Sequence, residues 1–257
     1  MFDNDTNYLD QHFLIDEEVI NDFINYADIR SNDEVVEIGP GIGNITKILL
    51  TKAKKVTVIE KDERLIPYLL ELKKKYSNLE IIHANVLDTY IPDCDKIITS
   101  LPYSIIEPFI NKLIKCKFKT LTMIMGSNYI EEVMTKSNNK LSLLTNSFFN
   151  IEKLRDINPT SFEPKPKTLS GIIKLSPIKL DKIKDKKRYL IRQLFFYRNM
   201  KIKNALKEAI ISYDNISQKE AKAIIDKINI DEEILEDKME TISNINLDKL
   251  VSYVDRL

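Results

Sequence analysis

Short apolar runs alternate with stretches of helical hydrophobic spacing through the first half of the chain. The apolar runs predict buried strands near residues 35–38, 56–60, 79–83, 96–101 and 121–126, separated by helices near 44–51, 62–75 and 105–115. Strands that are apolar throughout and that alternate with helices are typical of a parallel sheet covered by helices. The pattern therefore predicts a doubly wound α/β fold, in which ligands bind at the carboxyl ends of the strands.

The segments around this alternation extend the predicted architecture. A helix capped by Asp16 precedes the first strand, and residues 148–156 and 171–175 predict an antiparallel pair of strands after the fifth. A lysine run after Pro177 marks a boundary, and the remaining residues have helical spacing, including a predicted capping box at residues 217–220 (SQKE). We therefore expect two domains, residues 1–178 and residues 179–257.

Three of the five glycines of the chain, Gly39, Gly41 and Gly43, lie in one segment, residues 35–43 (VVEIGPGIG). The segment predicts a buried strand that turns into a helix, and the glycines let the backbone approach a ligand closely. An ordinary strand-to-helix turn is the alternative. About twenty residues later, Glu60 ends the second predicted strand, where a carboxylate can accept hydrogen bonds from both hydroxyls of an adenosine ribose.

Glu37, just before the glycines, affects which nucleotide ligand the loop suits. A dinucleotide would place an anionic pyrophosphate on the loop, and a nearby carboxylate would repel it. S-adenosylmethionine has no phosphate and carries a cationic sulfonium, so the electrostatics favour it over NAD. A dehydrogenase is disfavoured further because the sequence offers no evident acid or base for hydride transfer.

Composition narrows the class of protein. The chain has 257 residues, 43% of them hydrophobic, which is enough for one large and one small packed domain. No apolar run reaches the roughly 18 residues of a membrane span, and the acidic N-terminus lacks the regions of a signal peptide, so we expect a cytoplasmic monomer without membrane contact. Cys94, Cys116 and the two histidines have no metal-ligand spacing, so we expect no metal site.

The net charge is zero, but the charges are unevenly distributed. Residues 1–40 contain eleven acidic residues and one basic residue, whereas residues 179–207 contain eleven lysines and arginines and two aspartates. A surface with the second balance suits a polyanion such as RNA, because phosphate contacts release counterions. A solvated helix face is the alternative.

Ser100, Leu101, Pro102 and Tyr103 follow the fourth predicted strand. The exocyclic amine of adenine is a poor nucleophile because its lone pair is delocalised into the ring, so a methylase needs acceptors that draw the amine hydrogens out of plane. The Ser100 hydroxyl and the Leu101 carbonyl can supply them, Pro102 fixes the turn, and Tyr103 can stack on the base. A structural turn with a buried ring is the competing interpretation.

Residues 162–167 (FEPKPK) predict a rigid, exposed loop. Phe162 could stack on the other face of an extruded base, while Lys165 and Lys167 could neutralise phosphates. A hydrophobic residue that pins a surface loop is the alternative.

Seven motifs in a fixed order resemble one family. From about Gln11 to the C-terminus the chain carries QHFLID, EIGPGIGNIT, VIEKDERL, ANVLD, SLPYSI, FEPKPKTLS and LFFYRNMKIKNAL. This order is similar to that of the ribosomal RNA adenine N6,N6-dimethyltransferases, the kasugamycin-resistance enzymes and their archaeal and eukaryotic relatives. The resemblance implies a Rossmann-like class I S-adenosylmethionine-dependent methyltransferase with a small C-terminal helical domain. It also implies methylation of two adjacent adenines in the 3′-terminal stem-loop of small-subunit rRNA during ribosome assembly.

The resemblance also implies which residues hold the cofactor. Gln11, Phe13 and Leu14 would border the methionine end of S-adenosylmethionine, and Gly39 and Gly41 would lie beneath it.

Further along the chain, the resemblance implies that Glu60 binds the ribose and Asn85 the adenine amine of the cofactor. Ser100 would be the first position of the cofactor-facing catalytic motif, and Tyr103 and Phe162 would hold the target adenine between them.

The basic residues point to the RNA surface. We expect the segment from Lys179 to Lys207 to face the side of the catalytic cleft, with Arg198, Lys201 and Lys203 holding RNA phosphates.

Three positions depart from the family pattern. Ser100 stands where the family usually has Asn, Asn85 stands where it usually has Asp, and residues 125–128 (MGSN) replace a Gln-Lys-Glu type segment that faces the substrate. Wider amino-methylases accept Asp, Asn or Ser at the catalytic position. Because the glycines and Glu60 are intact, the sequence favours an active enzyme. The alternative is a weakened or inactive relative that binds RNA as a ribosome-assembly or transcription factor.

Overall fold

The computed structural model describes residues 12–257, and the chain divides into two compact units. The first comprises Met1–Glu131 and Asn150–Pro177, and the second comprises Glu132–Phe149 and Ile178–Leu257. The sequence predicted a single domain boundary after residue 178, and it did not predict that residues 132–149 belong to the second unit.

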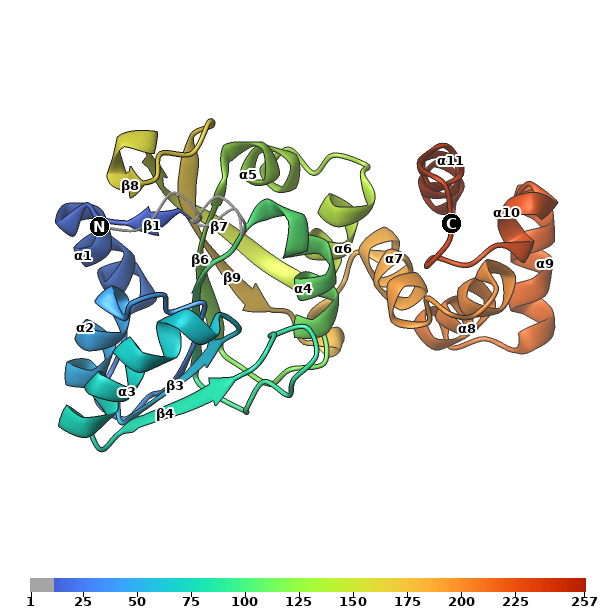
Figure 1. Ribbon diagram of the computed structural model, residues 1–257. Coiled ribbons are helices and arrows are strands. Elements are labelled where there is room, and N and C mark those ends of the chain that lie inside the picture. The colour runs from blue at the N-terminus through green and yellow to red at the C-terminus, as the bar shows by residue number, and fades with distance from the viewer. Residues whose placement is uncertain (1–11) are drawn as a thin grey trace. The chain divides into compact units, whose positions relative to one another are not determined.

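A seven-stranded sheet of order β4-β3-β2-β5-β6-β9-β7 organises the first unit (Figure 1). Its strands are β2 (Glu34–Ile38), β3 (Lys55–Glu60), β4 (Leu79–His83), β5 (Lys96–Ser100), β6 (Thr120–Gly126), β7 (Phe149–Ile157) and β9 (Ser170–Pro177). The five strands from β4 to β6 are parallel, and β9 is antiparallel to β6. The predicted α/β fold is confirmed, and each parallel strand begins within one residue of its predicted start.

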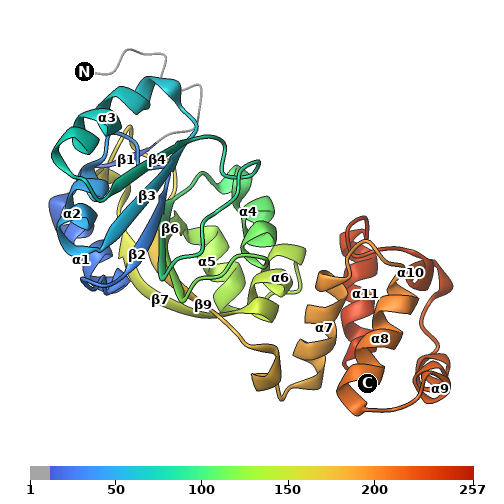
Figure 2. The same ribbon diagram turned by 90° about the horizontal axis from the view of Figure 1, so that it is seen from below.

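Helices cover both faces of this sheet. Figures 1 and 2 show α1 (Glu17–Ala27), α2 (Asn44–Lys52) and α3 (Ile66–Lys75) on one face and α4 (Ile106–Leu113) on the other. Asp16 caps α1 as predicted, because its side chain accepts hydrogen bonds from two backbone N–H groups of the first turn. A buried apolar core that includes Phe23, Leu49 and Ile98 packs α1, α2 and α3 against the strands.

Four elements of the structure were not predicted. Helices α5 (Ser127–Met134) and α6 (Lys140–Phe148) follow β6, and the two-residue strand β1 (Phe13–Leu14) pairs antiparallel with β8 (Phe162–Glu163). The β1–β8 pair joins segments about 150 residues apart at the start of the chain and in the FEPKPK loop.

The second unit is helical after Pro177, as expected. It contains α7 (Lys186–Phe196), α8 (Ile202–Asp214), α9 (Gln218–Ile228), α10 (Glu232–Glu236) and α11 (Asn244–Val254). The predicted capping box is present, since the side chains of Ser217 and Glu220 each bond the backbone N–H of the other residue.

Candidate active site

The carboxyl ends of β2, β3 and β5 bring the glycine loop and the Ser100 turn together. Ile38 pairs with Ile59 of β3 and Thr99 of β5, and the Thr99 hydroxyl donates to the Ile38 carbonyl at 2.9 Å. A Cβ built on Gly39 would lie 3.9 Å from the carbonyl oxygen of Ser100. The two most informative sequence motifs are therefore neighbours in space.

The glycine loop needs its glycines. Gly39, Gly41 and Gly43 have φ values of 68°, 59° and 88°, a left-handed conformation that costs energy for residues with a Cβ. A Cβ on Gly41 would also lie 3.1 Å from the ring of Phe13, so β1 packs directly on the loop. Leu14 of β1 is buried, while Gln11 lies outside the described residues.

Glu60 ends β3 with its side chain turned toward the glycine loop. The side chain is buried, and its carboxylate accepts hydrogen bonds from the backbone N–H of Gly41 at 3.3 Å and of Asp62 at 2.9 Å. Burial raises the pKa of Glu60, and the backbone donors oppose that change. Each carboxylate oxygen has a further lone pair, so Glu60 can accept bonds from a ribose without losing the loop.

Glu37 lies beneath the loop and has a partner that the sequence did not reveal. Its carboxyl group is buried and accepts a hydrogen bond from the Thr46 hydroxyl in the first turn of α2 at 2.6 Å. Burial raises the pKa of Glu37 to about 8. At neutral pH this group is largely uncharged, so its repulsion of a pyrophosphate is weaker than the sequence suggested. The sequence signal for this hydrogen bond was the position of Thr46 in the first helical turn after the glycine loop.

Asn85 follows β4 and forms a local turn. Its amide oxygen accepts the Leu87 N–H at 3.1 Å, and its amide nitrogen donates to the Asp88 carboxylate at 2.7 Å. The amide oxygen keeps a second lone pair for an adenine amine.

Ser100 is the last residue of β5 and is half-buried, as are Leu101 and Pro102. The Ile105 N–H donates to the Pro102 carbonyl at 3.3 Å and closes a short 3-10 turn, Tyr103–Ile105. The backbone therefore turns out of the sheet directly after Ser100, next to the glycine loop.

Phe162 lies elsewhere than the sequence suggested. It is 2% exposed and belongs to the same apolar core as Leu14, with which it pairs in the β1–β8 ladder. Burial favours the alternative of a hydrophobic residue that pins the loop over stacking on a base, because strand pairing turns the ring inward. Lys165 and Lys167 are exposed, as the loop predicted.

Several basic residues of the segment 179–207 have partners within the second unit. Lys201 and Lys203 both pair with the carboxylate of Glu236. Arg188 and Arg192 donate to backbone carbonyls, and burial lowers the pKa of both. Arg198 is half-buried.

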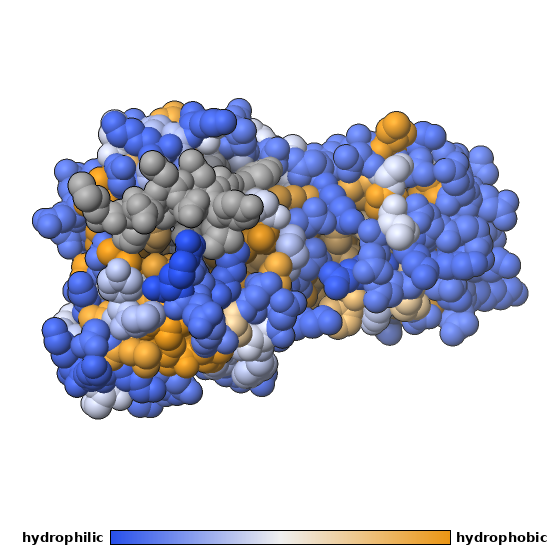
Figure 3. Space-filling model, viewed as in Figure 1, coloured by the Kyte–Doolittle hydropathy of each residue, from blue (hydrophilic) through white to orange (hydrophobic). Residues whose placement is uncertain are grey.

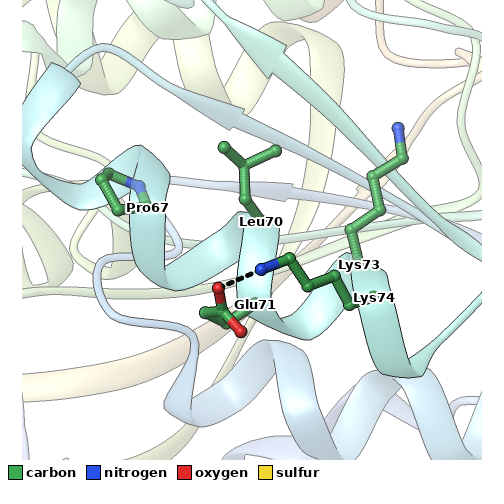
Figure 4. A pocket seen from close by; sticks show the side chains of 5 residues that line it. All are labelled: Pro67, Leu70, Glu71, Lys73 and Lys74. Carbon is green, nitrogen blue, oxygen red and sulfur yellow. Dashed lines mark hydrogen bonds and ion pairs between the residues drawn. The ribbon is translucent and has the colours of Figure 1, made fainter.

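A surface pocket of about 440 Å³ lies on α3 (Figure 4). Pro67, Leu70, Glu71, Lys73 and Lys74 line it, and Lys74 pairs with Glu71 at 2.5 Å. Figure 3 shows hydrophobic residues over α3 and β4 on this face. None of the predicted site residues lines the pocket, so we do not assign the cofactor to it.

Residues 12–257 contain neither a cluster of metal-ligating side chains nor a membrane-spanning helix. Within this part of the chain, no cluster of three or more His, Cys, Asp or Glu side chains is arranged to hold a metal ion. No helix described there has the length and apolar character needed to cross a membrane.

The fold and the strand-end site define the class. A parallel sheet with one antiparallel strand, a glycine loop after β2 and an acidic residue ending β3 make this chain a Rossmann-like class I methyltransferase. The chain has a TM-score of 0.65 and 25% identity to the crystal structure of a dimethyladenosine transferase from Plasmodium falciparum, covering 95% of this chain and 98% of that one. The crystal structure of the 23S rRNA methyltransferase ErmE has the same fold, with a TM-score of 0.62 over 95% and 99% of the chains at 21% identity.

Sequence comparisons identify the family. The profile described as ribosomal RNA adenine dimethylase matches residues 2–247. Over 234 residues the chain is 36% identical to ribosomal RNA small subunit methyltransferase A of Clostridium botulinum (strain Okra / Type B1), covering 85% of each. It is 30% identical over 257 residues to a probable ribosomal RNA small subunit methyltransferase A of Methanococcoides burtonii, covering 96% of this chain and 93% of the other. The chain belongs to the ribosomal RNA adenine dimethylase family, and the predicted enzyme class and S-adenosylmethionine cofactor are confirmed.

Proposed function

We propose that this enzyme methylates N6 of two adjacent adenines near the 3′ end of small-subunit rRNA during ribosome assembly. The observation that carries this proposal is the closeness of the glycine loop to the Ser100 turn, where a Cβ built on Gly39 would lie 3.9 Å from the Ser100 carbonyl oxygen, because Ser100 and Leu101 offer two acceptors for an amine. The names of the relatives from C. botulinum and M. burtonii support the small subunit as the source of the RNA. A cytoplasmic location and a monomeric state remain predictions.

The residues at the strand ends fit S-adenosylmethionine. The left-handed backbone at Gly39 leaves room for a ligand, the ring of Phe13 covers Gly41, and the Glu60 carboxylate at the end of β3 suits a ribose. We assign Phe13 and Leu14 to the border of this site because β1 packs on the loop. When bound, the cofactor supplies an electrophilic methyl group.

Ser100 and Leu101 prepare the target amine. In the first transfer the Ser100 hydroxyl and the Leu101 carbonyl would accept hydrogen bonds from the two N–H groups of the amine, which draws the nitrogen out of the ring plane and localises the lone pair on it; in the second transfer one N–H remains to donate. Acceptors placed this way would stabilise the positive charge that develops on nitrogen as the N–C bond forms and the S–C bond of the cofactor breaks, so they act mainly in the transition state. S-adenosylhomocysteine would then leave, and the nitrogen would release a proton to solvent. We assign Tyr103 to stacking on the base, and we do not assign Phe162 to it because that ring is buried.

The departures from the family pattern at Ser100 and residues 125–128 suggest a second candidate function. An enzyme that lost methyl transfer would keep the RNA surface and act as a ribosome-assembly or transcription factor.

Mass spectrometry separates the two functions. The full chain is incubated with labelled S-adenosylmethionine and an unmodified transcript of the 3′-terminal stem-loop, which is then digested to nucleosides. Labelled N6-methyladenosine and N6,N6-dimethyladenosine are the expected products. Cofactor binding without any labelled nucleoside would refute the proposed activity and support the RNA-binding factor.

A further inference from the structure

The turn between α7 and α8 exposes aromatic side chains. Phe196 is 60% exposed and Tyr197 is 36% exposed, with their rings edge to face at 5.2 Å between centroids. The Met200 N–H donates to the Tyr197 carbonyl at 2.8 Å, and α8 then begins after Lys201. Exposed aromatic rings beside lysines are the features with which proteins hold unpaired nucleotides.

Two lysines of the same turn converge on one carboxylate. The Nζ of Lys201 lies 2.5 Å from Oε2 of Glu236, and the Nζ of Lys203 contacts Oε1 of the same side chain. These two contacts hold the pKa of Glu236 down at about 2. The two ammonium groups therefore bind the two oxygens of one carboxylate. An RNA phosphate also has two non-bridging oxygens and could bind the same pair of ammonium groups.

The backbone holds Glu236 opposite the lysines independently of the ion pairs. The Ile202 N–H donates to the Asp237 carbonyl at 2.8 Å, and the Glu240 N–H donates to the Arg198 carbonyl at 3.1 Å. Lys201 also forms an antiparallel bridge with Lys238. Neutralising Glu236 should therefore leave the turn in place.

We propose that Lys201 and Lys203 form a phosphate site for unpaired RNA, that Glu236 occupies this site in the free protein, and that RNA displaces it while a base stacks on Phe196 or Tyr197. This inference rests on the proposed function, since it takes rRNA as the ligand.

Exposure makes the exchange feasible. The side chains of Lys201, Lys203 and Glu236 are 48%, 43% and 38% exposed, and ion pairs at such positions are weakened by water and salt. A phosphate that replaces the carboxylate gains the same two contacts and releases its counterions. The surplus of basic residues in 179–207, eleven against two acidic residues, favours a polyanion such as RNA as the ligand.

The decisive variant is Glu236→Gln, which removes the competing charge and keeps the shape of the side chain. Glu208→Gln, an exposed carboxylate on α8, is the matched control for net charge. Binding of the fluorescent stem-loop transcript to the full chain is measured by anisotropy at several KCl concentrations. We expect Glu236→Gln to tighten binding roughly 3- to 10-fold at low salt and to steepen the salt dependence, with a smaller effect of Glu208→Gln.

A double-mutant cycle tests the displacement itself. Replacing Lys201 and Lys203 by Ala should weaken binding more in the Glu236→Gln background than in the wild type, because only there are both lysines released for RNA. Tyr197→Ala should weaken binding roughly 5-fold or more through lost stacking.

Several outcomes would overturn the inference. Glu236→Gln binding that is unchanged or weaker, with an unchanged unfolding midpoint, means that the carboxylate does not compete with RNA. An equal effect of the lysine replacements in both backgrounds means the same. The methylation assay separates this result from the proposed function, because an active enzyme insensitive to Glu236 overturns only the phosphate site. Tighter binding by Glu236→Gln in an enzyme that transfers no methyl group overturns only the proposed activity.

Discussion

The buried carboxyl group of Glu37 predicts an unusual pH dependence of stability. Its side chain is 2% exposed, and its pKa is raised from 4.5 to about 8, mainly by burial, against the opposing hydrogen bond from Thr46. In the unfolded chain the group loses its proton near pH 4.5, whereas in the folded protein it keeps the proton to about pH 8. The folded state therefore binds more protons between these values, so this group lowers the free energy of unfolding as the pH rises through that window.

Glu37→Gln is the perturbation that isolates this effect. Glutamine has nearly the same shape, its amide oxygen can accept the Thr46 hydrogen bond, and it does not ionise. Since one pH unit between the two pKa values corresponds to about 1.4 kcal/mol, the variant should be about 1 kcal/mol more stable than the wild type at pH 5 and about 3 kcal/mol more stable at pH 7. The difference should level off at about 5 kcal/mol above pH 8.

Urea unfolding of the cofactor-free proteins, followed by circular dichroism from pH 5 to pH 8.5, measures this difference directly. Glu80→Gln on β4 is the control, because the ion pair with Lys55 lowers the pKa of Glu80, so its contribution to stability is constant from pH 5 to pH 8.5 and is lost only at lower pH. A difference between wild type and Glu37→Gln that stays constant over this pH range would show that Glu37 is ionised in the folded protein, and the reasoning would fail.

Three other predictions concern the active site. Glu60→Ala should weaken S-adenosylmethionine binding in calorimetry roughly 10-fold or more, because charge-assisted bonds to the ribose are lost; equal affinities would remove Glu60 from the cofactor site. Ser100→Ala should lower the single-turnover rate roughly 10- to 100-fold with little change in cofactor affinity, and Ser100→Asn should retain or raise it; an Ala variant as fast as the wild type would leave the Leu101 carbonyl as the sole acceptor. Gly41→Ala should cost about 1 to 2 kcal/mol of stability through its left-handed backbone and its contact with Phe13, which an unchanged urea midpoint would contradict.

The sequence predicted those features that depend on local hydrophobic period. Each strand from β2 to β6 is a short, mostly apolar run rich in β-branched residues, so its start could be found within a residue. The caps at Asp16 and Ser217 were equally local, because each bonds backbone groups within the next three residues. Helices α5 and α6 were not predicted. The polar residues 135–139 (TKSNN) divide this segment, and each half has too few apolar positions to show a repeated helical period.

The features that escaped prediction join distant parts of the chain. The inward turn of Phe162 depends on pairing with Leu14, and the ion pairs of Lys201 and Lys203 depend on Glu236. The spacing of residues within one segment does not show which distant residues they contact. A run of lysines gives the same sequence pattern whether its side chains face solvent or pair with a carboxylate. The hydrogen bond between Thr46 and Glu37 was easier to predict, because the two residues lie on either side of the same glycine loop.

The departure at Ser100 changes the side-chain acceptor and leaves the backbone acceptor in place. Ser100 pairs with Ile124 of β6, and the preceding Thr99 bonds the Ile38 carbonyl, so sheet contacts on both sides fix the backbone that leads to Leu101. We therefore expect the backbone at Leu101 to keep its course whichever side chain stands at residue 100. Serine instead of asparagine shortens one of two acceptors, which is why a reduced rate of methyl transfer follows more directly from this structure than a lost one.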